Sequence, residues 1–400
     1  MPRALGPFHP RRRTHDAPGA LRAVGRRLHG HAREHEHALA DDAGCACRRL
    51  RARCPGDLRS ARHERRTRGA RWRSCLGAAA VSARPVGVGL LGLGTVGSAV
   101  ARAFADRSRR IDAAAGRPVR LVAAAVRDPQ KARDAGDVPV TADPHAILDD
   151  PEVAIVVEVI GGTEPARELD LGAFERKKHL VTANKEIVAK EWKALHEAAR
   201  VAKRELRFEA AVAAAVPVIA GMRGLGAVRP RVLRGLVNGT TTYICSRMES
   251  GKSFDEALAE AIAAGYAEAD PTNDVDGHDA AYKLSILVSL LEGRHFHPDN
   301  VRRTSLRGIA ASDVTGAAAH GARVRYLAVA DFGEKATKAR VGPEEVPADS
   351  LEGQATGPTN VITLESDLVP RLVWSGPGAG GDATASAILG DVIQIAQRLA

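Results

Sequence analysis

The chain has 400 residues, of which 44% are hydrophobic and 26% charged, and its formal net charge is +10 at pH 7. This length and composition are sufficient for two hydrophobic cores, so we expect a globular enzyme rather than a disordered chain. The sequence contains no run of about 18 apolar residues, which excludes a membrane-spanning helix of the usual kind. We therefore expect no membrane partner.

The excess positive charge lies in the first 84 residues. This segment holds 20 arginines, no lysine and 7 acidic residues, a net charge of +13, so the rest of the chain carries −3. A basic field attracts polyanions, which makes a nucleic-acid-binding protein one alternative function. The segment lacks the interleaved aromatic residues that a single-strand binder uses. We therefore predict no nucleic-acid partner.

Residues 1–84 are rich in Arg, His, Ala and Gly without sustained apolar periodicity, which predicts a disordered leader. The segments HGHAREHEH and CAC offer imidazole and thiolate ligands, but their spacing lacks the paired knuckles of a zinc finger. Two interpretations stay open, a transit peptide and a start codon assigned too far upstream, and the composition favours the second. Four of the five cysteines lie here, leaving only Cys245 elsewhere, which predicts a cytoplasmic protein without disulfides.

After residue 85 the chain reads VGVGLLGLGTVGSAVARAF, a short apolar strand followed by a glycine turn and a helix. Gly92, Gly94 and Gly97 match the pattern G-x-G-x-x-G, in which the glycines allow a tight turn, close approach of the pyrophosphate, and packing of helix on strand. Because the pattern lies between the strand and helix that it requires, it predicts a dinucleotide site at the helix N-terminus. Thr95 and Val96 complete the predicted cofactor contacts in this turn.

The residues that contact the adenosine ribose should follow the next predicted strand, residues 119–126. Arg127 and Asp128 stand there. A guanidinium suits the 2′-phosphate of NADP, whereas a carboxylate suits the ribose hydroxyls of NAD. We expect NADP as the cofactor, bound in part by Arg127, with NAD also usable.

Further strand and helix signals alternate along the chain. Residues 153–162 predict a buried parallel strand and its loop, residues 165–178 a helix, and residues 179–185 a strand that ends in Lys185. Ligands bind beyond the carboxyl ends of such strands, which places Lys185 near the nicotinamide. The alternation predicts an α/β fold with a Rossmann-like parallel sheet.

Seven segments resemble, in the same order, the successive motifs of the homoserine dehydrogenase family. They are GLGTVG, VVEVIGGTEPA, VTANKEIVA, FEAAVAAAVPVI, LVNGTTTYI, GYAEADPTNDVDGHDAAYK and GPGAGGDATASAILGDVI. The resemblance runs from about Val86 to the end, and GYAEADPTNDVDGHDAAYK is its most specific part. Another small Rossmann oxidoreductase, such as an aspartate dehydrogenase-like enzyme, is the alternative, but it would not explain GYAEADP followed by a helix lysine.

The resemblance implies an NAD(P)-dependent enzyme that interconverts L-aspartate 4-semialdehyde and L-homoserine in threonine, methionine and isoleucine biosynthesis. It implies a Rossmann domain over residues 85–210, a second α+β domain for substrate binding and dimerisation over residues 211–383, and a C-terminal helix over residues 384–400 that returns to the first domain. Gly265 and Gly380 match positions that line the cofactor. A homodimer and a monofunctional chain without a C-terminal regulatory domain are further expectations.

Asp279 and Lys283 are spaced at i and i+4, so on a helix they share one face. From spacing alone this is a solvated ion pair of about 0.3–0.5 kcal/mol. The resemblance implies instead that Lys283 donates a proton to the developing alkoxide, and that Lys185 contacts the cofactor and shares this role. Three acidic residues are implied as substrate ligands: Glu268, Asp270 and Asp279.

The resemblance also implies a site for a monovalent cation such as Na⁺, formed mainly by backbone oxygens. Its matching positions are Glu209, Val212, Ala214 and Val216. The sequence departs from the family here, because glycines are common at the positions of Ala214 and Ala215, and asparagine is common at Thr242. If either alanine position requires a positive φ, alanine strains the loop.

Overall fold

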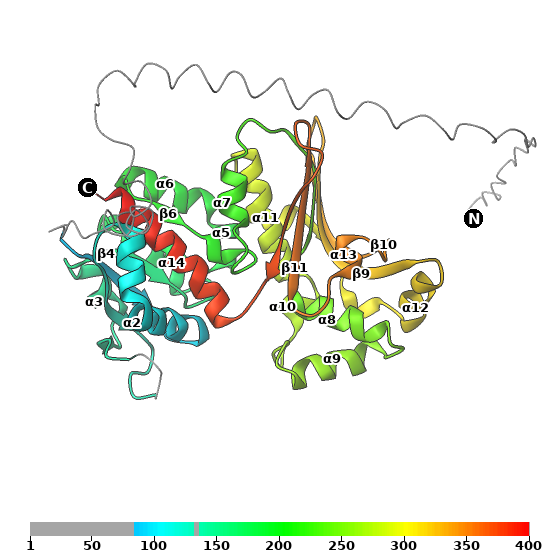
Figure 1. Ribbon diagram of the computed structural model, residues 1–400, viewed down its shortest axis with the longest axis horizontal. Helices are drawn as coiled ribbons and strands as arrows, with labels where there is room; N and C mark the ends of the chain where they lie inside the picture. The colour runs from blue at the N-terminus through cyan, green and yellow to red at the C-terminus, as the bar shows by residue number, and fades with distance from the viewer. Residues whose placement is uncertain (1–83, 132–135, 400) are drawn as a thin grey trace, which may run out of the picture. The chain divides into compact units, whose positions relative to one another are not determined.

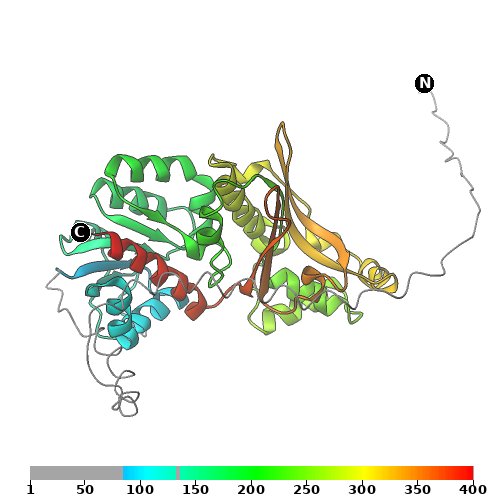
Figure 2. The same ribbon diagram turned by 45° about the horizontal axis from the view of Figure 1, so that its top comes forward.

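The computed structural model describes residues 84–131 and 136–399, all within one compact unit of the chain. The predicted leader lies, apart from its last residue, outside these described residues. The described chain forms two six-stranded sheets with helices packed against them (Figures 1 and 2). None of its helices is long and apolar enough to cross a membrane.

The first sheet has the doubly wound Rossmann order β3-β2-β1-β4-β5-β6, and every neighbouring pair of strands is parallel. Its strands are β1 (Val86–Leu91), β2 (Val119–Ala125), β3 (Val140–Thr141), β4 (Val153–Glu158), β5 (His179–Thr182) and β6 (Leu206–Arg207). The strand order changes direction between β1 and β4, where such sheets bind ligands beyond their carboxyl ends. This arrangement confirms the predicted Rossmann-like α/β fold.

Two hydrophobic clusters cover the two faces of this sheet. Val88 and Leu90 of β1 pack with α2 (Thr95–Ala115) and α14 (Gly381–Arg398). Leu91 of the same strand points to the other face and packs with the remaining helices of this region. These are α3 (Pro144–Asp149), α4 (Ala166–Glu175) and α6 (Trp192–Ala202). Because both faces are covered, the central strands are continuous apolar runs.

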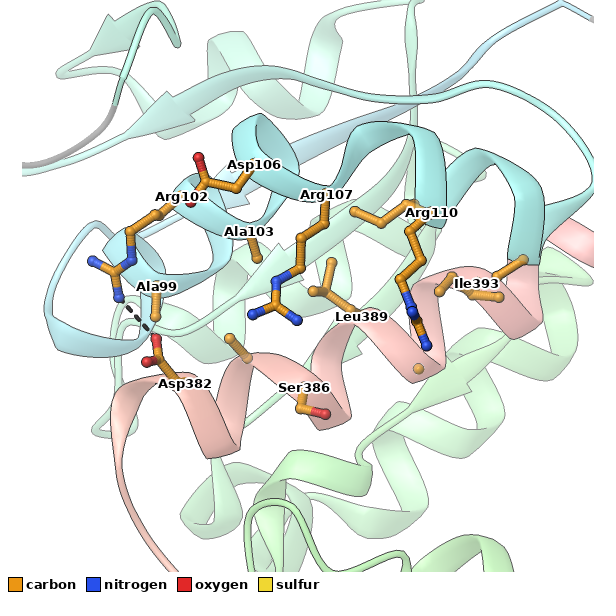
Figure 3. A pocket seen from close by; sticks show the side chains of 14 residues that line it. Ala99, Arg102, Ala103, Asp106, Arg107, Arg110, Asp382, Ser386, Leu389 and Ile393 are labelled. Atoms are coloured by element: carbon orange, nitrogen blue, oxygen red, sulfur yellow. Dashed lines mark hydrogen bonds and ion pairs between the residues drawn. The ribbon is translucent and has the colours of Figure 1, made fainter.

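The C-terminal helix α14 lies beside α2, although the two are at opposite ends of the described chain (Figures 1 and 2). It begins at Gly381, slightly before the predicted start at Thr384, and its Ile388 is fully buried in the core of the first sheet. An exposed groove follows the contact between the two helices, with Arg107 and Arg110 on the α2 side and Leu389 on the α14 side (Figure 3). The chain thus closes its Rossmann core with its last helix.

The second sheet is mixed and has the order β12-β11-β7-β9-β10-β8. Only the pair β8–β10 is parallel among its described neighbours, and the other pairs are antiparallel. Its strands are β7 (Pro230–Leu236), β8 (Val301–Arg303), β9 (Ala322–Phe332), β10 (Thr337–Pro347), β11 (Thr359–Ser366) and β12 (Leu372–Pro377).

Helices of the second region pack mainly on one face of this sheet, where they bury the largest hydrophobic cluster. They are α7 (Val218–Arg223), α8 (Gly239–Met248), α9 (Phe254–Ala263), α10 (Thr272–Val275), α11 (His278–Glu292) and α12 (Ala311–Ala319), with short 3-10 turns η3 (Glu209–Ala211), η4 (Pro298–Asn300) and η5 (Leu306–Gly308). Helix α13 (Leu351–Gln354) contacts β9 and β10 and contributes no residue to this cluster. The cluster also includes Val188 of α5 (Lys185–Lys190), Trp192 of α6 and Phe208. This cluster thus has residues on both sides of the predicted domain boundary at residue 210, and α5 packs directly on α11.

Candidate active site

The glycine turn after β1 has the geometry of a phosphate-binding turn. Gly92 has φ 106°, and a Cβ there would lie 3.1 Å from the carbonyl oxygen of Val159. A Cβ on Gly97 would lie only 2.1 Å from the Gly92 carbonyl oxygen, so glycine is required where α2 passes the strand. A Cβ on Gly94 would meet no atom within 4 Å, and no side chain caps α2. The first amides of α2, at Thr95 and Val96, therefore face open space that suits a pyrophosphate.

Gly380 lies close to this turn, whereas Gly265 has no hydrogen bond to it among the described residues. Gly380 has φ 112° and precedes α14, and a Cβ on its neighbour Gly381 would lie 2.9 Å from the Thr95 carbonyl oxygen. Gly265 is exposed, has φ 75° and donates its amide to Ile262 after α9. The cofactor contact of Gly265 thus stays a prediction.

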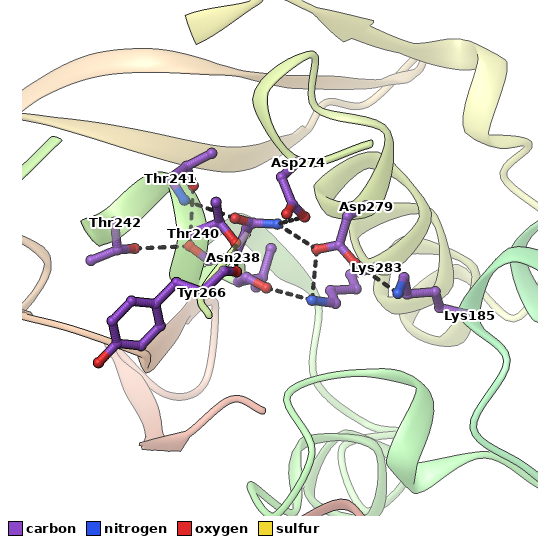
Figure 4. A network of polar contacts seen from close by, with 10 residues as sticks. Lys185, Asn238, Thr240, Thr241, Thr242, Tyr266, Asp274, Asp279 and Lys283 are labelled. Atoms are coloured by element: carbon purple, nitrogen blue, oxygen red, sulfur yellow. Dashed lines mark hydrogen bonds and ion pairs between the residues drawn. The ribbon is translucent and has the colours of Figure 1, made fainter. Parts of the chain in front are cut away.

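A buried carboxylate joins two lysines from different parts of the chain. Asp279 is 6% exposed near the start of α11, and its Oδ2 accepts a hydrogen bond from Lys283 Nζ at 2.7 Å, one turn further along the helix. Its other oxygen, Oδ1, lies 3.0 Å from Lys185 Nζ, at the first residue of α5 (Figure 4). Lys283 Nζ also donates to the Val237 carbonyl oxygen at 2.6 Å.

The two lysines keep this buried carboxylate charged. Burial by itself would raise the pKa of Asp279, but the positive charges of Lys283 and Lys185 outweigh it and hold the pKa well below its usual range. The carboxylate in turn raises the pKa of Lys185. The cluster therefore provides ammonium groups in a largely desolvated setting, where their hydrogen bonds are stronger than in water.

Two further residues of the network were not predicted from the sequence. Asn238 Nδ2 donates to Asp274 Oδ1 at 2.7 Å and to Asp279 Oδ2 at 2.9 Å, while Asn238 Oδ1 caps α8 by accepting from the Thr241 amide (Figure 4). Burial and the nearby charge of Asp279 raise the pKa of Asp274. The available signals were the helix-capping position of Asn238 in LVNGTTT and the acidic loop that contains Asp274.

The predicted substrate ligands Glu268 and Asp270 do not join this network in the described chain. Both are exposed in the loop between α9 and α10. Asp270 Oδ1 accepts from the Thr272 amide at 3.1 Å, and this local bonding lowers its pKa. Glu268 has no hydrogen bond or ion pair with any described residue. The substrate contacts of Glu268 and Asp270 stay predictions.

Thr242, where the family commonly has asparagine, donates its hydroxyl hydrogen to the Asn238 carbonyl oxygen at 3.0 Å.

Arg127 is exposed two residues beyond the end of β2. Asp128 is also exposed, and its Oδ1 accepts from the Gln130 amide at 2.9 Å. The structure thus leaves both side chains at the edge where the ribose of a dinucleotide lies in this fold.

The predicted cation loop follows η3 and is strained. Ala213 has φ 58° and Ala214 has φ 45°, a conformation that alanine rarely adopts, whereas Ala215 has no positive φ. The expected strain is therefore present at Ala214 and absent at Ala215. Glycine is favoured at such positions because it has no Cβ.

The oxygens of this loop partly fit a cation. Among the described residues, the carbonyl oxygens of Val212 and Ala214 accept no hydrogen bond, while those of Glu209 and Val216 each accept one from a backbone amide. The Glu209 carboxylate accepts from two amides of α7, those of Ile219 and Ala220. Two unpaired carbonyls in a buried loop favour an electropositive ligand.

A phosphate-binding turn at the switch point of a doubly wound sheet, with charged lysines beyond the strand ends, places the chain among oxidoreductases that use a nicotinamide dinucleotide. Comparison with known families agrees. Residues 92–209 match the model described as homoserine dehydrogenase, NAD binding domain, and residues 217–393 match that described as homoserine dehydrogenase. The chain belongs to the homoserine dehydrogenase family, so its activity is that of an oxidoreductase on the CH–OH group of homoserine.

Individual relatives cover most of the described chain. The homoserine dehydrogenase of Pseudomonas aeruginosa is 40% identical over 318 residues, which cover 79% of this chain and 73% of the relative. That of Synechocystis is 41% identical over 318 residues, covering 78% and 73%. The crystal structure of a homoserine dehydrogenase from Thiobacillus denitrificans superposes with a TM-score of 0.76 at 41% identity, covering 78% of this chain and 73% of that one.

Proposed function

We propose that the Lys283–Asp279–Lys185 cluster carries out the proton chemistry of interconverting L-aspartate 4-semialdehyde and L-homoserine. When bound, the nicotinamide supplies the hydride that reduces the aldehyde carbon. The protein must then stabilise the developing alkoxide and protonate it. The observation that supports this assignment is the presence of two charged lysines on one desolvated carboxylate, at the carboxyl-end side of the sheet.

Lys283 is the better placed proton donor of the two. An ammonium group has three N–H bonds, and Lys283 uses two of them on acceptors of the protein, Asp279 Oδ2 and the Val237 carbonyl oxygen. The third is left for a substrate oxygen. Lys283 is 12% exposed at its side chain and Lys185 42%, so Lys283 is more firmly held. Lys185 then contacts the cofactor side and helps to hold Asp279.

The substrate ammonium is assigned to the acidic loop. Asp279 contributes a fixed negative charge, and Asp274 is held next to it through Asn238. Glu268 is free of other partners among the described residues, which leaves its carboxylate for the ammonium, and Asp270 lies in the same loop. The support for Glu268 and Asp270 is their family resemblance together with this exposure.

A direct assay separates this function from the alternative. The purified chain should oxidise NADPH with L-aspartate 4-semialdehyde and should show no oxidation with oxaloacetate and ammonia, the substrates of an aspartate dehydrogenase-like enzyme. The reverse pattern would contradict the assignment. Running both assays with NADH as well measures the cofactor preference.

We infer a preference for NADP from Arg127, since a guanidinium pairs with the 2′-phosphate. A hyperthermophilic archaeal homoserine dehydrogenase, 27% identical with a TM-score of 0.68, has been solved in complex with NADPH. Arg127→Ala is expected to raise the dissociation constant of NADPH by about tenfold, because one charge-assisted hydrogen bond is lost. The dissociation constant of NADH should stay nearly unchanged. Arg231→Ala, an exposed arginine on the second sheet, is the matched control. If the substitution weakens the binding of NADPH and NADH equally, Arg127 does not contact the 2′-phosphate.

We further propose a monovalent cation at the loop of Glu209, Val212, Ala214 and Val216, supported by its unpaired carbonyls. Ala214→Gly should raise the free energy of unfolding by up to about 1 kcal/mol, because relief of the left-handed strain exceeds the entropy cost of glycine. Ala211→Gly is the control, since Ala211 has no positive φ and should only lose stability. Urea denaturation of both variants, with and without Na⁺, gives the comparison. Equal destabilisation by both substitutions would contradict strain at Ala214.

A homodimer that uses the second sheet is also proposed. Val373 on β12 is 43% exposed and pairs with Thr363 across the strands, so it shares the sheet face of Val361, away from the main core. Leu351 of α13, which packs on β9, is also 43% exposed. Exposed hydrophobic side chains on one sheet face suit a self-complementary contact. The molar mass in solution, measured by light scattering, tests the proposal.

A further inference from the structure

A buried carboxylate that is not among the predicted site residues ends the central strand β4. Glu158 is fully buried, and its Oε1 accepts hydrogen bonds from the amides of Ile160 at 2.6 Å and Gly161 at 3.2 Å. Its Oε2 accepts from the Thr182 hydroxyl at 2.6 Å, at the end of the neighbouring strand β5. One side chain thus holds the ends of two adjacent strands.

The hydrogen bonds continue from Thr182 to the start of α5. Thr182 Oγ1 accepts from the Asn184 amide at 2.9 Å. Asn184 caps α5 by accepting from the Ile187 amide, and its Nδ2 donates to the Gly162 carbonyl oxygen at 2.7 Å. Asn184 therefore returns the network to the loop after β4. The next residue, Lys185, is the one that reaches Asp279.

The loop after β4 lies against the predicted cofactor site. The Val159 amide donates to the Leu91 carbonyl oxygen at 2.9 Å, and Val159 is the residue that a Cβ on Gly92 would meet. Gly161 and Gly162 in this loop both have positive φ, at 78° and 75°, and the Gly161 amide is one of the donors to Glu158. The carboxylate thus determines the shape of a loop that borders the glycine turn.

Hydrogen-bond donors surround Glu158: burial raises the pKa of this carboxyl, and the hydrogen bonds that it accepts act in the opposite direction. The amides of Ile160 and Gly161 donate to Glu158, and the Thr182 hydroxyl donates to Glu158 while it accepts from the Asn184 amide. A second buried acid nearby, Asp170 on α4, has no hydrogen-bond partner for either oxygen among the described residues. Burial, and to a lesser extent the proximity of Glu158, raises the pKa of Asp170 well above its usual value.

We propose that Glu158 is a positioning residue for hydride and proton transfer, which couples the loop at Val159–Gly162 through Thr182 and Asn184 to Lys185. This inference rests on the proposed role of Lys185 on the cofactor side of the site. Both segments are parts of the proposed reaction geometry. Misplacement of a reacting group by about 1 Å costs roughly 10²-fold in rate.

The matched pair Thr182→Val and Thr182→Ser tests the coupling, because valine keeps the shape of threonine and serine keeps its hydroxyl. Thr182→Val is expected to lower kcat by about tenfold and to weaken NADPH binding, with the KM for L-aspartate 4-semialdehyde within about twofold of the parent. Thr182→Ser should retain most of kcat. The thermal unfolding midpoint of each variant is measured alongside. Parent-like kcat in the valine variant, or equal losses in both, would overturn the proposal.

A second variant covers the case in which Thr182→Val does not fold. Glu158→Gln keeps the volume but brings an amide donor to face the donors at Ile160, Gly161 or Thr182, so it should lower kcat to a similar extent. Parent-like kcat there would also overturn the proposal. Lys185→Met tests the underlying role separately. Full activity of Lys185→Met would show that Lys185 has no role in the reaction. If Lys185→Met loses activity and Thr182→Val keeps the parent kcat, the role of Lys185 stands and only the coupling through Glu158 is rejected.

Discussion

Lys283→Ala is expected to lower kcat by about 10²–10⁴-fold, the usual contribution of a positioned general acid. The alkoxide that forms when the aldehyde is reduced needs a proton, and Lys283 is the ammonium held at two points by the protein, with one N–H left to donate. The dissociation constant of NADPH should stay within about twofold, because Lys283 belongs to α11 and its hydrogen bonds go to Val237 and Asp279, not to the glycine turn before α2. The kinetic loss should therefore appear in the chemical step.

Steady-state kinetics, with NADPH binding followed separately by fluorescence, measure this effect. Lys338→Ala, on the exposed part of β10, removes the same charge from a distant surface and should leave kcat unchanged. If Lys283→Ala keeps a near-normal kcat, Lys283 is not the proton donor and Lys185 becomes the candidate for this role. In that case Lys185→Met should show the larger loss of the two lysine variants.

Asp279→Asn is expected to reduce both activity and stability. The substitution leaves Lys283 and Lys185 facing each other without the carboxylate between them, and Asn238 loses a charged acceptor. Removing one partner of a buried ion pair costs about 3–5 kcal/mol of unfolding free energy, more than most single substitutions. The KM for the substrate should rise as well, since the carboxylate is proposed to attract the substrate ammonium.

The pH dependence of this stability loss provides a sharper check. The pKa of Asp279 is lower in the folded chain than its unfolded value of about 3.9, so the carboxylate stabilises the fold above that pH. This contribution is lost as the pH falls through the folded pKa. The difference in unfolding free energy between parent and Asp279→Asn should thus be largest near pH 7 and shrink below about pH 4. A difference that stays constant when the pH is lowered from 7 to well below 4, measured by urea denaturation, would show that Asp279 acts by packing alone.

The features that the sequence predicted correctly depend on neighbours along the chain. The spacing of Gly92, Gly94 and Gly97 between an apolar strand and a helix is sufficient for a phosphate-binding turn, because only glycine tolerates the positive φ and the close backbone contacts there. The separation of Asp279 and Lys283 by one helical turn likewise places both on one face of α11. Local geometry determines both results.

The sequence by itself thus determined the Rossmann turn, the parallel sheet and the helical Asp279–Lys283 pair. Only the tertiary structure decided which other groups meet them: Lys185 comes from α5, Asn238 caps α8, and the exposed loop of Glu268 stays out of the network. The sequence pattern also did not predict the left-handed backbone conformation of Ala213 and Ala214 after η3, or the burial of Glu158 at the ends of two strands. These features arise from contacts between residues far apart in the chain, whose packing overrides the local preferences that a sequence displays.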